Sequence, residues 1–246
     1  MLTKRDLLRS SARHYPFLPS RGRVPLLNGR LTDIPSGEIV GTREGTRVRV
    51  MRDGMYRSVY FWGDYEPYQT KVYRRIVRSG DITFDVGANF GWYSALFAQW
   101  VGGTGRVHAF EPVSFIHDLA AETIALNSSA ERVQLNPFGL GREKADITLF
   151  TYSGLPHGHA TATDLARTDA VRHTCEIRRL DDYCQEHGIA SIDFMKVDVE
   201  GAEIDVFAGG GRVLSCSDAP VIAFEINSTC LKPRSLHGSD IVARGG

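Results

Sequence analysis

The sequence predicts an α/β fold, namely a doubly wound, mostly parallel β-sheet with helices on both of its faces. Short apolar runs rich in β-branched and aromatic residues alternate with helical patterns, which is typical of successive βαβ units. Several of these runs end in glycine or an acidic residue, as strands do where a parallel sheet holds a ligand at its carboxyl edge. With 246 residues and 42% apolar content, the chain can build one such domain and a smaller appendage.

Residues 1–41 predict a basic arm rather than part of the core. Residues 1–30 contain seven Lys or Arg and one acidic residue, which leaves 22 basic and 28 acidic residues for the rest of the chain. The functional interpretation is contact with an acidic partner, a phosphorylated substrate or a membrane surface, and the simpler one is a solvated arm. No aromatic ladder accompanies the basic residues, so we expect no nucleic-acid partner.

The composition also indicates the cellular location and the state of the cysteines. No apolar run is long enough to predict a membrane span or the apolar part of a signal peptide, so the expected location is the cytoplasm. The four cysteines show neither metal spacing nor a C-x-x-C pair, and we expect free thiols at Cys175, Cys184, Cys216 and Cys230.

Residues 42–79 predict a small antiparallel patch and a helix that leads into the main domain. Alternating residues across Val48–Val50 and Met55–Phe61 indicate two or three strands joined at the turn Asp53-Gly54. The segment Tyr68–Arg78 has a helical pattern instead.

Residues 80–246 form the predicted main domain, and its most informative stretch is DITFDVGANFGW, from Asp81 to Trp92. An apolar strand leads into a glycine turn, and a helix follows as far as Val101. Glycines let a ligand approach the backbone, the helix start offers free N–H donors, and an acid at the strand end can accept from an amine or hydroxyl. The expected ligand-binding residues are Asp85, Gly87, Ala88, Asn89 and Gly91.

The spacing of this turn discriminates between ligands. A dinucleotide site needs G-x-G-x-x-G, whereas this turn has D-x-G-x-x-x-G, which disfavours a pyrophosphate and therefore NAD. S-adenosylmethionine presents an ammonium and a carboxylate, which suit an acid beside a glycine turn. The alternative is an ordinary strand-to-helix turn that binds nothing.

The next two strands end in further candidates. Arg106–Phe110 is followed by Glu111 and Pro112, and an acid at this place in a doubly wound sheet accepts hydrogen bonds from both ribose hydroxyls. A strand from Val133 ends in Phe138, which together with Gly139 is expected to lie beside an adenine. A core role for that phenylalanine is an equal alternative.

A set of six motifs between Gly80 and Asn227 resembles the FkbM family of methyltransferases. The motifs are DVGANFG, AFEP, IALN (124–127), RRLDDY (178–183), MKVDVEGAE (195–203) and PVIAFEI (220–226). The resemblance implies a Rossmann-like, S-adenosylmethionine-dependent methyltransferase that acts on a hydroxyl of a sugar, a polyketide or another small metabolite. The family continues with a helix and two closing strands, whereas Ser228–Gly246 has room only for the helix. Either the chain is truncated, or its sheet ends early and leaves an exposed edge that a second copy of the chain can cover.

Residues 153–173 predict a flap over the substrate, between strands Asp146–Tyr152 and Thr174–Leu180, because a loop of this length is unusual inside a domain. His157 and His159 alternate within it, so a base or a two-histidine metal site is an alternative. No carboxylate partner stands at a fixed spacing, and no metal is predicted.

The remaining segments predict a capped helix, a fourth strand, a helix interrupted by glycines at 209–211, and a fifth strand. Asp181 is expected to cap the short helix that ends near His187. In the fourth strand, Ser191–Val199, the alternation places Lys196 and Asp198 on one face.

Methyl transfer to an alcohol requires removal of the hydroxyl proton. Asp198 and Glu200 are the candidate bases because they lie near the end of the fourth strand, and Lys196 is expected to steady a carboxylate or the forming alkoxide. The alternative is that Asp198 holds the cofactor or caps the next helix. A second function for the whole chain is a nonenzymatic nucleoside-binding or interaction module with a degenerate site.

Overall fold

The structure is a computed structural model that describes residues 34–152, 160–162 and 167–226, and the chain divides into two compact units, Met1–Tyr73 and Arg74–Gly246. In the first unit, β1 (Ile39–Gly41) pairs antiparallel with β2 (Arg47–Arg49). Helix α2 (Tyr56–Trp62) follows, and α3 (Pro67–Ile76) runs across the division between the units.

The expected strand at Met55–Phe61 is wrong, because these residues belong mainly to helix α2. Tyr56, Val59 and Tyr60 are buried at spacings of three and four residues, which a helix places on one side. The side chain of Asp53 accepts a hydrogen bond from the Met55 N–H at 2.8 Å, so the Asp53-Gly54 turn starts a helix instead of a hairpin.

The predicted arm, residues 1–41, also extends too far. Ile34 and Val40 are only 3% and 1% exposed, so the last part of this segment belongs to the core of the first unit. Residues 1–33 lie outside the described residues.

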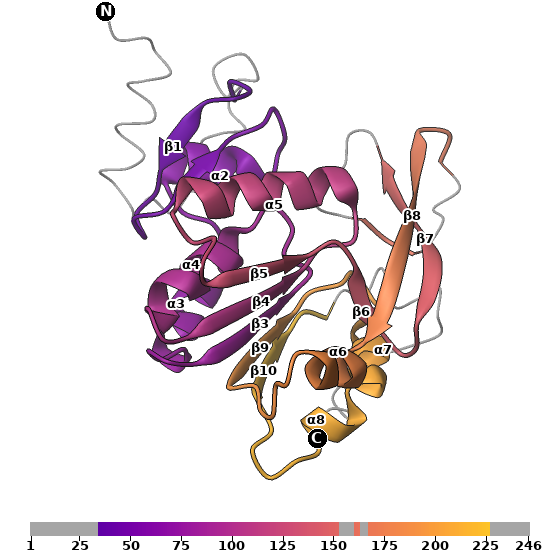
Figure 1. The fold of residues 1–246 in the computed structure, drawn as a ribbon. Helices are drawn as coiled ribbons and strands as arrows, with labels where there is room; N and C mark the ends of the chain where they lie inside the picture. The colour runs from indigo at the N-terminus through magenta and orange to yellow at the C-terminus, as the bar shows by residue number, and fades with distance from the viewer. Residues whose placement is uncertain (1–33, 153–159, 163–166, 227–246) are drawn as a thin grey trace, which may run out of the picture. The chain divides into compact units, whose positions relative to one another are not determined.

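The second unit is built on a five-stranded parallel sheet with the order β10-β9-β3-β4-β5 (Figure 1). Its strands are β3 (Ile82–Val86), β4 (Arg106–Phe110), β5 (Val133–Asn136), β9 (Phe194–Val197) and β10 (Val221–Phe224). The chain proceeds from β3 outward to β5 and then returns to the other side of β3. The pair β3 and β9 is therefore the switch point, where doubly wound sheets bind their ligands.

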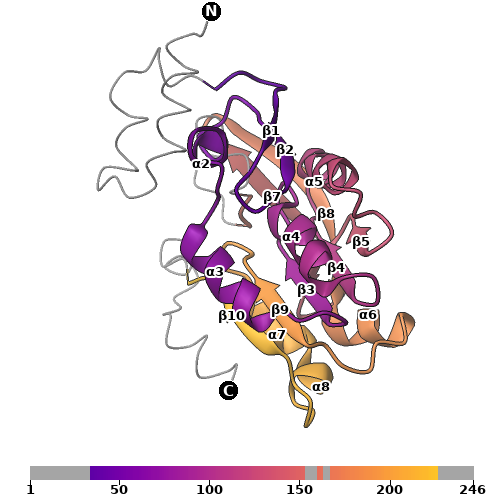
Figure 2. The ribbon, with the colours of Figure 1, turned by 90° about the vertical axis from the view of Figure 1, so that its left-hand side faces the viewer.

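Helices cover both faces of this sheet, which confirms the predicted fold class (Figure 2). Helix α4 (Trp92–Val101) packs on one face, where the rings of Phe97 and Phe194 lie 5.5 Å apart, and α5 (Ser114–Leu126) lies next to it. Helix α6 (Leu180–Glu186) packs on the other face, where the Tyr183 and Phe84 rings are 5.9 Å apart. The glycine-interrupted helix is observed as α7 (Glu203–Gly209) and α8 (Gly211–Leu214) on this second face.

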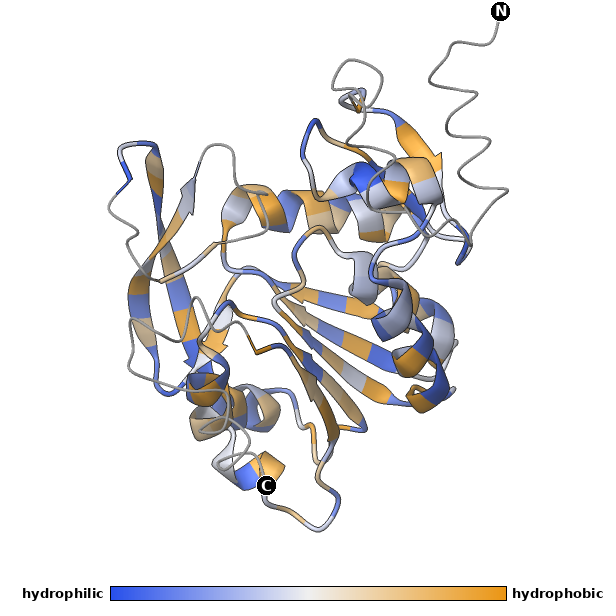
Figure 3. Ribbon diagram, turned by 180° about the vertical axis from the view of Figure 1, so that it is seen from behind, coloured by the Kyte–Doolittle hydropathy of each residue, from blue (hydrophilic) through white to orange (hydrophobic). Residues whose placement is uncertain are grey.

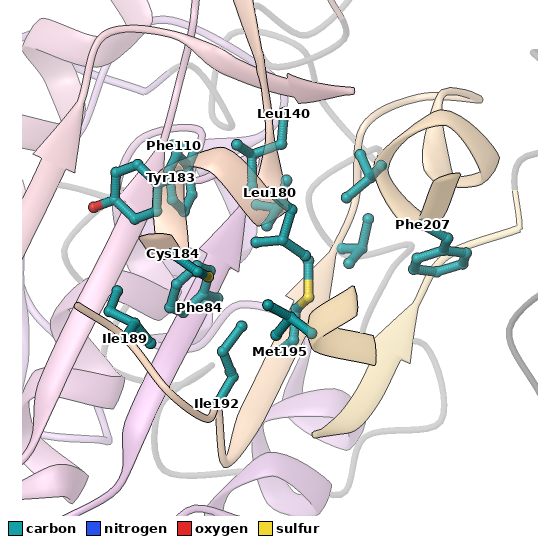
Figure 4. Close-up of a cluster of buried hydrophobic side chains, with 14 of the residues drawn as sticks. Phe84, Phe110, Leu140, Leu180, Tyr183, Cys184, Ile189, Ile192, Met195 and Phe207 are labelled. Atoms are coloured by element: carbon teal, nitrogen blue, oxygen red, sulfur yellow. The ribbon is translucent and has the colours of Figure 1, made fainter. Parts of the chain in front are cut away.

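The main core of the second unit lies between the sheet and helices α6 to α8 (Figure 4). Phe84, Phe110, Met195 and Tyr183 meet there and are fully buried. The strands show alternating hydrophilic and hydrophobic bands in Figure 3. Because alternate residues of a strand point to opposite faces, the two faces of this sheet differ in chemistry.

A second sheet has the order β6-β8-β7, with β6 (Gly139–Gly141), β7 (Ala145–Tyr152) and β8 (Ala170–Arg179). The predicted flap, residues 153–173, is therefore too long, since β8 already begins at Ala170. Within it, Thr161 exchanges backbone hydrogen bonds of 2.8 and 3.1 Å with Phe150, so this residue pairs with β7. His157 and His159 lie outside the described residues.

Strand β10 is an edge of the parallel sheet as far as the described residues go, and its Val221 is 52% exposed. Pairing of this edge with a second copy of the chain stays a prediction, and residues 227–246 lie outside the described residues. Among the helices within 34–152, 160–162 and 167–226, none combines the length and apolar character that crossing a bilayer requires.

Candidate functional site

The glycine turn after β3 is held by backbone hydrogen bonds to the neighbouring strand. The N–H groups of Gly87 and Ala88 both donate to the Phe110 carbonyl, at 3.1 and 3.0 Å. Gly87, Asn89 and Gly91 have φ values of 80°, 51° and 80°, so three residues of this short segment adopt the left-handed conformation. The side chain of Asn89 accepts the Phe90 N–H at 2.8 Å, which supports its own strained position.

Gly87 and Gly91 are required for packing of the chain itself. A Cβ atom on Gly87 would lie 1.9 Å from the Asp198 carbonyl oxygen, and one on Gly91 would lie 3.0 Å from the Ala120 backbone. The first contact joins the turn after β3 to the turn after β9, and the second brings α4 close to α5. The sequence predicted these glycines for close approach of a ligand, whereas the structure shows a close approach of backbone.

Glu111, directly after β4, holds the glycine turn in place. One carboxylate oxygen accepts the Asn89 N–H at 3.0 Å, and the other accepts the Val113 N–H at 3.1 Å. The residue is 6% exposed, and burial raises the pKa of its carboxyl to about 7 although these two hydrogen bonds oppose the shift. Each oxygen keeps a lone pair beyond these bonds, so hydrogen bonds from two ribose hydroxyls remain compatible with this arrangement.

A second buried carboxylate belongs to Asp85 in β3, which is 0% exposed. Its Oδ2 accepts a 2.6 Å hydrogen bond from the Ser94 hydroxyl of α4, and its Oδ1 lies 3.6 Å from Nζ of Lys196. Burial raises the pKa of Asp85, while the lysine charge and the Ser94 hydrogen bond lower it. The carboxylate therefore lies beneath the glycine turn, between the sheet and helix α4.

Lys196 in β9 connects the strand ends at the switch point. Its ammonium is 3.6 Å from Asp85, 3.4 Å from Asp198 and 3.3 Å from the Gly87 carbonyl, and it lies 5.5 Å from the centre of the Tyr93 ring. The predicted shared face of Lys196 and Asp198 agrees with the contact between them, although β9 ends at Val197 and Asp198 lies just beyond it. The Asp198 side chain is 29% exposed.

The turn after β9 contains Glu200, the second candidate base. Glu200 has a φ of 51° and Gly201 a φ of 99°, so the chain reverses sharply before α7. Glu203 secures this turn, because its Oε1 accepts the N–H groups of Val199 and Gly201, each at 3.2 Å.

Phe138 lies in the core, the alternative that the sequence left open. Its ring is 5% exposed and packs against Phe110, with the Arg178 guanidinium 4.0 Å from the ring centre. Gly139 is crowded instead by Ile177 and Pro112, whose atoms would lie 2.8 and 3.5 Å from an added Cβ. Contact of Phe138, Gly139 or Pro112 with a cofactor stays a prediction.

Three contributions escaped the sequence analysis. Ser94 is a small hydroxyl residue at the start of a largely apolar helix, and the sequence pattern assigns it no role. Glu203 lies within the motif MKVDVEGAE, and the signal for its role is an acid two residues after Gly201. Asp181 does not cap its own helix, because its two oxygens accept the N–H groups of Arg212 and Val213, each at 3.0 Å, at the start of α8.

No group of three or more His, Cys, Asp or Glu residues suited to a metal ion occurs in the part of the chain that the structure describes. Cys175, Cys184 and Cys216 are free thiols, and Cys230 lies outside that part.

Comparison with known families identifies this arrangement. The model of the methyltransferase FkbM domain matches residues 85–233. The chain belongs to this family. The match begins at Asp85 and includes the glycine turn, Glu111 and the turn after β9.

Several curated methyltransferases are similar to this chain. The methyltransferase sdnD of Sordaria araneosa is 29% identical over 159 residues, which cover 53% of this chain and 61% of that protein. The 2-O-methyltransferase NoeI of Sinorhizobium fredii is 28% identical over 160 residues, with shares of 59% and 65%. The 31-O-demethyl-FK506 methyltransferase FkbM of Streptomyces tacrolimicus is 32% identical over 160 residues, with shares of 54% and 60%.

These matches span less than two thirds of the length of those three relatives. Among solved structures, an S-adenosylmethionine-dependent O-methyltransferase from Thermotoga maritima aligns with a TM-score of 0.45 and 15% identity. The alignment covers 88% of this chain and 64% of the Thermotoga maritima protein.

The chemistry of the FkbM site fits S-adenosylmethionine, the methyl donor of this family. The cluster at the switch point brings the carboxyl groups of Asp85, Glu111 and Asp198 together with the ammonium of Lys196, and the donor carries a positive sulfonium and an ammonium. Among these carboxyl oxygens, Oδ1 of Asp85 is buried and makes no hydrogen bond, although the Lys196 ammonium lies 3.6 Å from it. Such an excess of buried acceptors favours a cationic ligand with donor groups.

Proposed function

We propose that this chain is an S-adenosylmethionine-dependent O-methyltransferase whose acceptor is a hydroxyl group of a small molecule such as a sugar or a polyketide. The observation that carries the proposal is the convergence of the glycine turn, Glu111 and Asp198 at the switch point of an FkbM-family domain. The names of two relatives, a 2-O-methyltransferase and a 31-O-demethyl-FK506 methyltransferase, support oxygen as the methylated atom. A cytoplasmic location is part of this proposal.

When bound, S-adenosylmethionine supplies an electrophilic methyl group on a positively charged sulfur. On this proposal Glu111 accepts hydrogen bonds from the ribose hydroxyls with the lone pairs that Asn89 and Val113 leave free. The turn from Gly87 to Gly91 and the first N–H groups of α4 bind the amino-acid end. Phe138 and Gly139 are proposed to border the adenine, with Pro112 fixing the turn after Glu111.

Asp198 is proposed as the general base. Its carboxylate would accept the proton of the acceptor hydroxyl as the methyl group passes from the donor sulfur, which leaves as a neutral thioether, to the hydroxyl oxygen, and this avoids a free alkoxide. Lys196, at 3.4 Å, holds this carboxylate in place and lowers the energy of negative charge that develops nearby. Glu200 is the second candidate for the same role.

Ligand binding tests the cofactor assignment directly. Calorimetry and thermal shift with S-adenosylhomocysteine should show binding and a raised melting temperature, because a ligand that binds only the folded state stabilises it. NAD should give no shift under the same conditions. Binding without methyl transfer to any sugar or polyketide hydroxyl would favour the nonenzymatic nucleoside-binding module instead.

The variant Asp198→Asn tests the base. We expect cofactor affinity within a few-fold of the parent and a methylation rate lower by about 10², the usual scale for a lost general base. Asp193→Asn is the matched control. Asp193 lies just before the amino end of β9, whereas Asp198 lies just after its carboxyl end, and the Asp193 carboxylate accepts the Ile82 N–H at 2.7 Å. Normal turnover of Asp198→Asn would remove Asp198 from the chemistry, and Glu200→Gln would then be measured.

A further inference from the structure

The turn from Asp198 to Ala202 has a conformation that its own sequence does not favour. Glu200 is a non-glycine residue in the left-handed region, at a φ of 51°. Such a residue costs free energy on the order of 1 kcal/mol, and it persists only where the surroundings hold it. Hydrogen bonds from neighbouring groups must therefore stabilise this conformation.

Glu203 contributes two hydrogen bonds to this turn through a single oxygen. Its Oε1 accepts the N–H groups of Val199 and Gly201, which flank the strained residue on both sides, at 3.2 Å each. The residue is 1% exposed, and a carboxylate taken out of water costs free energy unless its bonds compensate. Burial raises the pKa of Glu203, and these N–H donors act against that shift.

The same turn determines where Asp198 lies. The Asp198 N–H donates to the Val86 carbonyl at 3.0 Å, its carbonyl oxygen lies against Gly87, and its carboxylate is 3.4 Å from Lys196. The chain on the amino side of Asp198 is thus fixed by the sheet. On the carboxyl side, the Val199 and Gly201 N–H groups donate to Glu203, and the Ala202 N–H donates to the Val199 carbonyl at 3.3 Å. A change at Glu203 therefore alters the direction of the Asp198 side chain.

We propose that Glu203 is a positioning residue, which acts on methyl transfer by holding the turn that presents Asp198 and makes no contact with the methyl donor or the acceptor. This inference rests on the proposed function, because it assigns to Glu203 an effect on the base. It goes beyond that function by naming a buried residue outside the predicted catalytic set.

Asp181 provides a matched control. It is 8% exposed, and like Glu203 it is a carboxylate that accepts two backbone N–H groups at the start of a helix, those of Arg212 and Val213. The two N–H groups that Asp181 binds belong to α8, and its described hydrogen bonds and ion pairs do not include Lys196 or Asp198. Loss of either carboxylate removes the same kind of structural support, but only Glu203 adjoins the base.

The first measurement is amide hydrogen exchange, which needs no acceptor substrate. In Glu203→Ala the amides of Val199 and Gly201 should exchange faster, because exchange reports local opening of hydrogen bonds. In Glu203→Gln they should stay protected, since the amide oxygen still accepts both bonds. Asp181→Asn should change exchange only at Arg212 and Val213. Equal protection of Val199 and Gly201 in Glu203→Ala and in the parent would overturn the inference.

The second measurement is kinetic. Glu203→Ala should lower kcat by about 10²-fold, the scale expected for a reacting group displaced by an ångström, with cofactor affinity within a few-fold of the parent. Glu203→Gln should recover most of the rate, and Asp181→Asn should keep the parental kcat. The double variant Asp198→Asn with Glu203→Ala should be no slower than Asp198→Asn alone, because both act on one group.

Two results separate the inference from the proposed function. Additive losses in the double variant, or an unchanged kcat in Glu203→Ala, would overturn the positioning role while methyl transfer by the parent stands. If the parent binds no S-adenosylhomocysteine and methylates no hydroxyl, the proposed function falls and the inference falls with it.

Discussion

The two faces of strands β3 and β9 are buried to the same depth but carry opposite chemistry. Phe84 and Met195 point into the apolar core beneath α6 and are 0% exposed (Figure 4). Asp85 and Lys196, their immediate neighbours along the strands, are 0% and 5% exposed and face α4. Burial of the first pair stabilises the fold, whereas burial of ionisable groups costs free energy that the fold alone does not require. We therefore propose that the functional groups lie on the α4 side.

The largest effect on stability should come from the apolar face. Phe84→Ala should lower the free energy of unfolding by about 4 kcal/mol, because it removes a buried ring and leaves a cavity. Chemical denaturation measures this loss. Val221→Ala is the control, since Val221 lies in the same sheet but is 52% exposed, and it should change stability by less than about 0.5 kcal/mol. Similar losses in the two variants would show that the core is not where we place it.

A somewhat smaller effect should follow from removing the cation on the other face. Lys196→Met should cost about 3 kcal/mol, because it leaves the Asp85 carboxylate buried without its partner. Methyl transfer should also fail, since Asp198 loses the same ammonium. The second change Asp85→Asn in this background should restore much of the stability but none of the activity. Recovery of both would mean that the pair is only structural.

On the face that carries the ionisable groups, Glu111 should make the protein less stable as the pH rises. Its folded-state pKa of about 7 lies above the ordinary value of 4.5, so its contribution is fully present below pH 4.5 and is lost as the pH rises through 7. The cofactor-free protein should therefore lose about 2.5 kcal/mol between pH 5 and pH 8 from this group. Glu111→Gln should flatten that part of the profile. If stability fell equally with pH in Glu111→Gln and in the parent, a group other than Glu111 would be responsible for the pH dependence.

The apolar face should show the opposite and smaller pH dependence through His108. This ring lies beside Phe84, and its Nδ1 is 2.8 Å from the Tyr183 hydroxyl. Burial lowers its pKa from 6.5 to about 4, so stability is lost as the pH falls from 6.5 toward 4, by about 2 kcal/mol between pH 7 and pH 5. His108→Phe should remove this dependence. Melting temperatures at pH 5 and pH 7 measure it, and loss at high pH instead would contradict the assigned sign.

The fold class and the strand ends could be predicted from the sequence because their signals are local. The run from Ile82 to Trp92 contains strand, turn and helix start within a few residues, and Glu111 directly follows its strand. Helix α2 was missed because a short segment such as Met55–Phe61 satisfies alternation and helical spacing equally well.

The parts of the site that escaped prediction depend on contacts between distant segments. Asp181 supports a helix that begins 30 residues later, and Ser94 meets Asp85 only because α4 folds back over β3. Glu203 lies close in sequence to the turn it supports, but an acid at the start of a helix usually has a purely local role. Propensities and motifs carry no information on which of these acids becomes buried.

The contact between Gly87 and the Asp198 carbonyl has a consequence for how such chains are recognised. With a Cβ position only 1.9 Å from that oxygen, a larger residue at 87 cannot be accommodated unless the turn after β9 also moves. A descendant that had lost its ligand and its chemistry would still need this glycine to fold. The first glycine of D-x-G-x-x-x-G is therefore a marker of architecture, and a search for working enzymes should give more weight to Asp198, whose partly exposed carboxylate holds no such backbone contact.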